Sequence, residues 1–462
     1  MSENPAPAIR ESPSSPGTAS LPLAATTEWL LIGAGCLIHI FLLPHAVGGD
    51  GAWRYSALTR LLEQGLLRTG VREELRYSLW MPLASAPLYL LGRYFQEPLA
   101  WVARFNLMLC FAGLVILYRQ LRGWIDAGTL RRALLLVLAA SMFPNHLRAY
   151  YGEVFSTMLA AVGMTALVAG RGWVGGSLLA VSAANTPALL PSLLVVAVKH
   201  TFDTRRLRHL SPVVATAGLY VLESYIRRGS LLSSGYEGEA GFRTLMPYSG
   251  LPGFSYPLAF GLLSVLFSFG KGLLFFMPGA FLAPRAAPGP EASATRRLYM
   301  LAVLFLAAMV AVYSCWWSWY GGWFWGPRFF LFGSLLASFV LATRLAPAPE
   351  HATPASAALT LVALALSVLV GVSGAVFDQT GLELCFANGY ALEALCWYVP
   401  EFSVLFHPFV AGPPLAVHQW GFIAFALAVL LYLGAPLAWV LARRMASAGR
   451  NLWGLLHQRW EW

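Results

Sequence analysis

The feature that most constrains this chain of 462 residues is a series of long apolar runs, which recur from residue 29 to residue 442. Each run is about 15 to 25 residues long, close to the length that an α-helix needs to cross the hydrocarbon core of a bilayer. Only 11% of the residues are charged, against about 25% in soluble domains. The sequence therefore predicts an all-α fold, a polytopic transmembrane helical bundle.

Basic residues indicate how this bundle is oriented. They cluster in connecting segments, which the positive-inside rule places in the cytoplasm. The clusters are 119–132, 199–208, 285–297, Arg344 and 443–450. With all of them inside, we expect a cytoplasmic N-terminus and about twelve crossings, in a range of about 11 to 13. The same loops account for the net charge of +10, so no nucleic-acid partner is expected.

Proline and charge patterns locate the individual crossings. Pro187 and Pro191 interrupt one apolar stretch, which indicates a hairpin of two short helices. Residues 79–95 are interpreted as interfacial or re-entrant, because a crossing there would place the first basic cluster outside. The expected crossings are 29–45, 99–118, 132–147, 153–170, 172–184, 187–199, 210–227, 270–284, 297–315, 328–345, 354–376 and 418–442.

The remaining segments divide the chain into four parts. Polar residues 1–28, rich in Pro, Ser and Ala, predict a disordered cytoplasmic tail. A transmembrane core over 29–345 includes the long outer loop 46–98, whose amphipathic stretch 52–67 is typical of an interfacial helix. Further membrane helices follow over 346–442, and 443–462 predicts a cytoplasmic interfacial tail with tryptophans at headgroup level.

The outer loops of this topology are 46–98, 145–153, 228–269, 316–328 and 377–417. Cys385 and Cys396 share the last of these loops, where a disulfide is one of two open alternatives.

Two acidic residues are expected at the outer face. Asp50 lies among glycines in "HAVGGDGAWRY", and Glu153 opens an expected crossing in "AYYGEVF". An ionised Asp costs about 2.5–3.5 kcal/mol at mid-bilayer, so its presence near a membrane helix suggests function. The alternatives are an ion pair of Asp50 with Arg54 and a capping role for Glu153. Together the two carboxylates could orient an acceptor hydroxyl or hold a divalent metal ion.

Two isolated cations are expected at the same outer face. Lys271 lies between two glycines in "SFGKGLL", and Arg328 follows five tryptophans in "WWSWYGGWFWGPRFF". Such side chains suit a phosphate anion, although each could instead extend to the interface without a ligand. The candidate donor-binding residues are Arg54, Tyr55, Arg76, Lys271, Tyr320 and Arg328. Possible contacts to an acceptor or sugar are His146, Tyr151 and Trp319.

Nucleotide and hydrolase motifs do not occur in the sequence. There is no Walker A lysine motif, no G-x-S-x-G elbow and no H-E-x-x-H pair. An activated donor would therefore reach the chain by another route. A substrate dissolved in the bilayer, with its phosphate at the surface, fits the distribution of charges.

The order of these motifs resembles a known family. "GGDGAWRY", "SLWMPLASAPLYLLG", "YYGEVF", "LLFSFGKGLL" and "WYGGWFWGPRF" together resemble bacterial integral-membrane glycosyltransferases of the GT-C superfamily, which are relatives of the protein O-mannosyltransferases and aminoarabinose transferases. The resemblance covers 29–345, which it implies is the catalytic core. A single Pro82 replaces the Pro-Pro tandem of the mannosyltransferases, and the first outer loop lacks their Asp-Glu pair.

The resemblance implies roles for individual residues. Asp50 would be the base or its organiser, and Glu153 the second acid. Lys271 and Arg328 would hold the lipid phosphate, with Arg54 and Arg76 as further contacts. The implied reaction moves a sugar from a polyprenyl-phosphate-linked donor to a hydroxyl of a glycan, lipid or protein, with inversion.

The expected location is the inner (plasma) membrane, with the site on the periplasmic side. Two rival functions remain at this point. One is a lipid-linked sugar flippase or transporter, and the other is an O-antigen-type ligase or polymerase.

Overall fold

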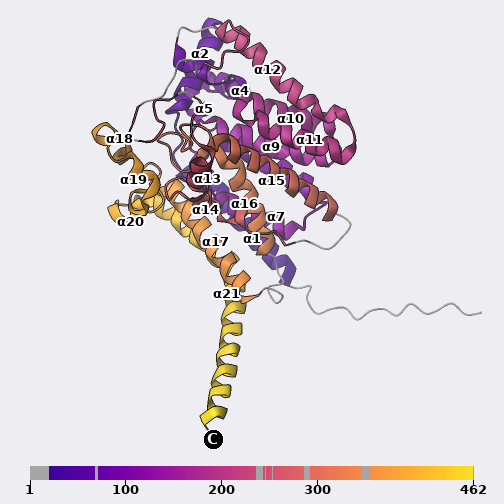
Figure 1. Cartoon of the computed structure of the whole chain (residues 1–462), viewed down its shortest axis with the longest axis vertical. Coiled ribbons are helices and arrows are strands. Elements are labelled where there is room, and N and C mark those ends of the chain that lie inside the picture. The colour runs from indigo at the N-terminus through magenta and orange to yellow at the C-terminus, as the bar shows by residue number, and fades with distance from the viewer. Residues whose placement is uncertain are drawn as a thin grey trace, which may run out of the picture.

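The computed structural model describes residues 20–67, 71–235, 243–244, 246–251, 253–285, 292–345 and 353–460. These residues form helices joined by turns and loops, with one isolated parallel bridge between Ala46 and Ala149. The predicted all-α bundle is confirmed (Figure 1).

The first half of the chain contains the helices α1 (Ser20–Leu37), α2 (Asp50–Gln64), α3 (Arg72–Arg76), α4 (Trp80–Tyr94), α5 (Pro98–Ala103), α6 (Phe105–Leu121), α7 (Ala127–Ala139), α8 (Phe143–His146), α9 (Gly152–Val168), α10 (Gly172–Asn185), α11 (Leu190–Thr204) and α12 (Ser211–Arg228). The second half contains α13 (Leu258–Phe267), α14 (Leu273–Phe276), α15 (Ala292–Ser314), α16 (Leu331–Arg344), α17 (Pro354–Val372), α18 (Glu383–Tyr390), α19 (Glu393–Tyr398), α20 (His407–Ala411) and α21 (Val417–Trp460).

Several helices are long and apolar enough to cross a membrane. Among the described residues, five helical segments meet that condition, and the chain is a multi-pass membrane protein. Their positions agree with five of the expected crossings, whereas the total number of crossings stays a prediction. The segments are Leu23–Leu42, Pro98–Leu121, Ala292–Ser314, Pro354–Phe377 and Val417–Ser447.

Some boundaries differ from the sequence-based expectation. Helix α1 begins at Ser20, ahead of the expected start at 29, and the tail before it lies outside the described residues. The crossing expected at 270–284 is wrong. That stretch forms α14 and a 3-10 turn at Pro278–Phe281, because Pro278 cannot continue a helix. Instead, α13 forms within the expected loop 228–269.

The predicted hairpin is confirmed, and one open alternative is decided. The stretch 172–199 is a hairpin of α10 and α11, which a short 3-10 turn at Pro187–Leu189 separates. Residues 52–64 of the amphipathic stretch 52–67 belong to α2, which ends at Gln64. A disulfide joins Cys385 in α18 to Cys396 in α19. Helix α21 continues without a break past its membrane segment and projects from the bundle (Figure 1).

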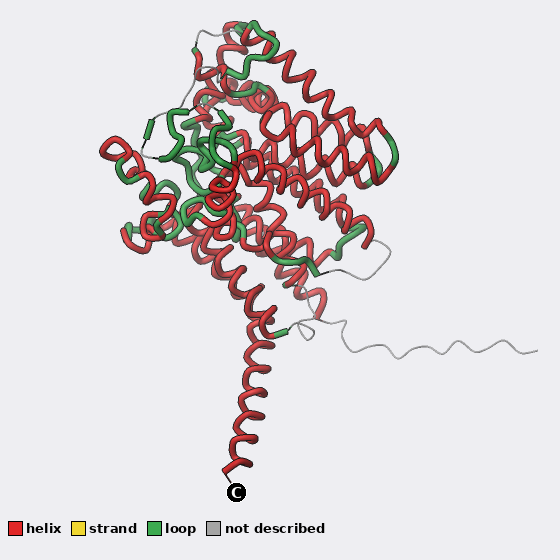
Figure 2. The backbone as a smooth tube through the Cα atoms, viewed as in Figure 1, coloured by secondary structure: helices red, strands yellow, loops and turns green. Residues whose placement is uncertain are grey.

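The core of the bundle surrounds α9. This helix packs against α6, α10, α15 and α16, and most of its residues are buried. Figure 2 shows the loops gathered mainly on one side of the molecule, between α2 and the α18–α20 segment. Because α2 and α9 both begin at this side, their N-terminal residues meet the loops there.

Candidate active site

The loop before α2 places Asp50 at the helix N-terminus. Ala46 donates its backbone N–H to the carbonyl of Arg148 over 2.9 Å, which ties this loop to the segment before α9. Gly49 has φ of 52°, a conformation that glycine adopts without strain. A Cβ on Gly51 would lie 2.6 Å from the carbonyl oxygen of Tyr150. The glycines around Asp50 therefore allow two backbone segments to approach closely.

A second loop, Gly321–Gly326, approaches the same place. Gly321, Gly322 and Gly326 have φ values of 75°, 76° and 64°. The turns at these glycines direct backbone carbonyl groups of the loop toward the side-chain nitrogen of Lys271. Its Nζ donates to the carbonyls of Gly322 over 3.2 Å and Gly326 over 2.9 Å, and also to that of Phe324. Lys271 thus supports the loop from behind.

Arg328 follows this loop and reaches both predicted acids. Its Nη1 donates to Oδ2 of Asp50 over 2.6 Å and lies 3.4 Å from Oε1 of Glu153. Its Nε donates to the carbonyl of Gly321 over 2.8 Å, and its guanidinium lies 3.9 Å from the ring centre of Phe324. Asp50 and Glu153, which are far apart in the sequence, therefore converge on one arginine.

This ion pairing keeps both partners charged. Burial raises the pKa of Asp50, but the charge and hydrogen bond of Arg328 and the hydroxyl of Tyr77 lower it, and the net pKa lies below its usual value. Burial lowers the pKa of Arg328, whereas Asp50 and Glu153 raise it, with a net increase. Asp50 is consequently a carboxylate at neutral pH and can accept a hydrogen bond or a proton.

A large cavity of about 940 Å³ opens beside the cluster. Its charged lining consists of Asp50, Arg54, Arg76, Glu153, Glu223, Arg228 and Arg328. Much of the remaining lining is apolar and includes Leu189, Phe305, Met309, Val312, Phe329 and Phe332. The cavity therefore combines a charged region with an apolar region, which suits an amphipathic ligand.

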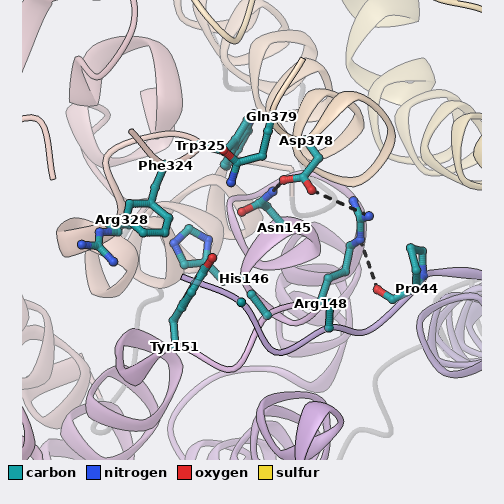
Figure 3. Close-up of a pocket in the computed structure, with 13 residues that line it drawn as sticks. Pro44, Asn145, His146, Arg148, Tyr151, Phe324, Trp325, Arg328, Asp378 and Gln379 are labelled. Atoms are coloured by element: carbon teal, nitrogen blue, oxygen red, sulfur yellow. Dashed lines mark hydrogen bonds and ion pairs between the residues drawn. The ribbon is translucent and has the colours of Figure 1, made fainter. Parts of the chain in front are cut away.

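A small cavity of about 150 Å³ lies on the other side of Arg328. Figure 3 shows its labelled side chains, with His146 and Tyr151 near Arg328 and with Asp378 near Asn145 and Arg148. Phe324 and Arg328 line both cavities. The two predicted sugar contacts His146 and Tyr151 thus face a cavity that adjoins the cluster.

Four other predicted residues lie outside the lining of both cavities. Lys271 is held by the carbonyls of the loop, and Tyr55 packs near Tyr89 with ring centres 6.0 Å apart. Tyr320 is buried and stacks on Trp397, whose ring centre lies 5.0 Å away, and Trp319 is also buried. The structure does not bring these residues together with Asp50.

The sequence interpretation missed several residues of the site, of which three bear most on its chemistry. Tyr77 donates its hydroxyl to Oδ1 of Asp50 over 2.8 Å. Glu223 of α12 lines the large cavity and accepts from the hydroxyl of Ser78 over 2.9 Å. Asp378 lies in the outer loop 377–417, for which no site residue was predicted. Of these three residues, only Tyr77 could have been predicted from the sequence, because it is adjacent to the predicted residue Arg76.

The two predicted metal ligands, Asp50 and Glu153, have an arginine between them. Calcium takes six to eight oxygen ligands, and magnesium keeps several waters beside one or two carboxylates. In the described part of the chain, no three His, Cys, Asp or Glu residues gather closely enough to hold a metal ion. A cation between these two carboxylates would have to displace Arg328. The residues present thus fit an ion pair better than a metal centre.

Comparison with known proteins gives matches to solved structures. No protein-family model matches the chain, and no curated protein matches it. A crystal structure of ArnT from Cupriavidus metallidurans in the apo state matches 89% of this chain and 78% of its own, with 17% identity and a TM-score of 0.51. The chain has the fold of ArnT. A second ArnT structure from that organism, bound to undecaprenyl phosphate, matches 91% and 78%, with 17% identity and a TM-score of 0.47.

The predicted resemblance to aminoarabinose transferases is therefore confirmed at the level of the fold.

Proposed function

We propose that this protein is a membrane glycosyltransferase of the GT-C type. It moves a sugar from a polyprenyl-phosphate-linked donor to an acceptor hydroxyl on the non-cytoplasmic face, with inversion. The observation that carries the proposal is the cluster of Asp50, Arg328 and Glu153 at the wall of a cavity with apolar and charged regions. The ArnT-like fold agrees with it.

The charges of the large cavity favour a singly charged ligand. Four arginines and three carboxylates line it in the described part of the chain, which leaves one excess positive charge. A polyprenyl-phosphate sugar is a phosphodiester with one negative charge. Its isoprenoid chain would lie along the apolar lining, and its phosphate would contact the arginines. Arginine suits this role because its planar group donates two parallel hydrogen bonds to phosphate oxygens.

The reaction would be a single displacement at the anomeric carbon. The acceptor oxygen forms a bond to this carbon while the bond to the phosphate oxygen breaks, and the phosphate leaves with the electron pair. Asp50 takes the proton of the acceptor hydroxyl or orients that hydroxyl. Arg328, with Arg54 and Arg76, stabilises the charge that develops on the departing phosphate. No general acid is needed, because phosphate is already a good leaving group.

The side of the membrane is part of the proposal. Disulfides form in oxidising compartments such as the periplasm. Cys396 of the disulfide precedes Trp397, whose ring lies 4.9 Å from Nζ of Lys271. Because Lys271 supports the Gly321–Gly326 loop, the disulfide and the cluster lie at the same side of the bundle. We therefore place the site at the periplasmic face of the inner membrane.

An assay of sugar transfer tests the proposal. Membranes that contain the protein are incubated with a radiolabelled polyprenyl-phosphate sugar, and the label that reaches glycan, lipid or protein is measured. Asp50→Asn should lower transfer by about 10²–10⁴-fold, as for loss of a general base. The matched control is Asp203→Asn, which removes only an exposed ion pair with Lys199. Near-normal transfer by folded Asp50→Asn, or lipid scrambling without any transfer, would contradict the proposal.

A further inference from the structure

The small cavity has no role in the proposed displacement. It lies against the reaction cluster, because Phe324 and Arg328 form walls of both cavities. Its other walls come from three separate parts of the chain, namely the loop before α2, the segment 145–151 and the end of α17. The last of these parts lies beyond residue 345, outside the region of the GT-C resemblance.

The backbone at the end of α17 positions Asp378 at the wall of this cavity. The helix ends in a π-helical turn at Ser373–Phe377, a feature that often occurs at functional sites. Arg148 donates to the carbonyl of Ala375 in this turn over 2.9 Å. Asp378 follows with φ of 46°, which is unfavourable for a residue with a side chain. Its carboxylate accepts from Asn145 over 2.7 Å and lies 3.9 Å from Arg148.

His146 adds a hydrogen-bond acceptor to the same cavity. Its Nδ1 lies 3.0 Å from the carbonyl oxygen of Met142, so this nitrogen must carry the proton. Burial and the charges of Arg328 and Lys271 lower the pKa of His146 to about 4. The ring is therefore neutral at physiological pH, and Nε2 is left as an acceptor for a ligand hydroxyl.

The cavity also offers aromatic surface and balanced charge. The rings of Tyr151 and Phe324 meet edge to face, with centres 5.2 Å apart. Arg148 compensates the charge of Asp378, whose side chain remains 40% exposed, and Arg328 is paired with Asp50 and Glu153. With both arginines paired to carboxylates, the cavity has no excess positive charge to attract a phosphate, and an isoprenoid chain would leave the polar groups without hydrogen-bond partners. A neutral ligand with several hydroxyl groups fits the mixed acceptors, donors and rings.

We propose that the small cavity binds a glycosyl ring, with Asp378 and His146 accepting hydrogen bonds from its hydroxyl groups. The volume agrees, since about 150 Å³ is about ten times the space that one water needs, and a hexose has about a dozen non-hydrogen atoms. The inference rests on the proposed function. The ring belongs either to the donor or to a glycan acceptor, because both carry a ring with several hydroxyl groups. Asp378 is then a residue that determines which sugar is accepted.

Two variants change the cavity by different means. Asp378→Asn keeps the shape but weakens the acceptor. Gly48→Leu fills the cavity, since Gly48 lines it and a Cβ there would have no atom within 4 Å. Gly33→Leu is the matched control, because Gly33 lies in α1 and has equally open surroundings. Folding is checked by thermal unfolding of the full-length protein in lipid nanodiscs.

Binding is measured with three probes: polyprenyl phosphate, polyprenyl-phosphoryl mannose or arabinose, and the corresponding methyl glycosides. If the ring is the donor's, Asp378→Asn and Gly48→Leu bind polyprenyl phosphate normally but lose about tenfold in affinity for the sugar-bearing lipid. If the ring is the acceptor's, binding of both lipids is unchanged. The variants then lose methyl glycoside binding in the presence of saturating sugar-bearing lipid.

Two outcomes would overturn the inference, and they can be told apart. If the wild-type protein does not bind polyprenyl phosphate, the proposed function fails and the inference fails with it. If the wild type binds polyprenyl phosphate, and the two folded variants bind all three kinds of probe as the wild type does, the small cavity is not a sugar site. In that case the proposed function stands.

Discussion

Lys271 and Arg328 are both basic side chains and lie on either side of one loop, yet their surroundings differ. The Nζ of Lys271 faces three backbone carbonyls of Gly322, Phe324 and Gly326 and is buried. The guanidinium of Arg328 faces the carboxylates of Asp50 and Glu153 and lines both cavities. In the sequence, each residue follows a glycine-containing aromatic or apolar run, and both were expected to hold phosphate.

The comparison shows that the partner decides what a buried cation can do. Carbonyl groups fixed in a loop cannot leave, so the N–H donors of Lys271 stay bonded to the loop and hold its shape. Carboxylates at the wall of a cavity are different, because a ligand can approach them and compete for Arg328. Arg328 is thus suited to bind a phosphate reversibly, whereas Lys271 is suited to stabilise the loop next to that site.

Within the comparison of the two cations, the largest expected effect follows from replacing Arg328 with glutamine. Arg328→Gln removes the group that we propose stabilises the departing phosphate, so transfer should fall by about 10²–10³-fold, as after loss of one oxyanion-hole donor. The measurement is the initial rate of label transfer in membranes with equal amounts of folded protein. Arg328→Lys keeps the charge without the planar fork and should fall between the wild type and Arg328→Gln. Equal rates for all three proteins would remove Arg328 from the mechanism.

The second prediction concerns Lys271. Lys271→Met leaves three buried carbonyls without their donor, at about 1–3 kcal/mol each, and should lower the free energy of unfolding by about 3 kcal/mol or more. Thermal unfolding in nanodiscs measures this change. Lys199→Met is the matched control, since Lys199 is partly exposed and forms an ion pair with Asp203. A surface pair of this kind contributes about 0.3–0.5 kcal/mol.

The same variant tests the role that the sequence suggests for Lys271. If Lys271 only supports the loop, the folded fraction of Lys271→Met still binds polyprenyl phosphate, with an affinity within about threefold of the wild type. A stable Lys271→Met protein that loses this affinity would restore Lys271 as a direct phosphate ligand. The comparison with Arg328 would then no longer hold.

Much of the fold follows from patterns that are local in the sequence. Long apolar runs require helices in a bilayer, because lipid offers no hydrogen-bond partners to the backbone. Pro187 and Pro191 therefore located the hairpin of α10 and α11 correctly. The same reasoning gave a wrong prediction for the stretch 270–284, which is apolar enough to form a membrane helix. Pro278 interrupts the helix there, and Gly270 allows a close approach to another segment, since a Cβ on it would lie 2.1 Å from the carbonyl oxygen of Cys396.

The site is less predictable, because contacts between distant segments create it. The convergence of Asp50 and Glu153 on Arg328 depends on three loops meeting, and no spacing in the sequence encodes that meeting. The sequence identified those three residues by their rarity in an apolar chain. It could not identify Asp378, because the π-helical turn that positions this residue has no charge or periodicity of its own.

The smallest expected effect concerns Tyr77 and the pH dependence of transfer. Tyr77 and Arg328 both lower the pKa of Asp50 against the effect of burial, so Asp50 loses its charge only as the pH falls through this lowered pKa. Tyr77→Phe removes one of these causes, and the acid limb of kcat/KM should move to higher pH. At neutral pH, where Asp50 stays ionised, transfer should fall by about threefold to tenfold. The control is Tyr94→Phe, since Tyr94 is exposed on α4. An acid limb that stays in place, or moves to lower pH, would mean that Asp50 is not the group whose ionisation limits transfer.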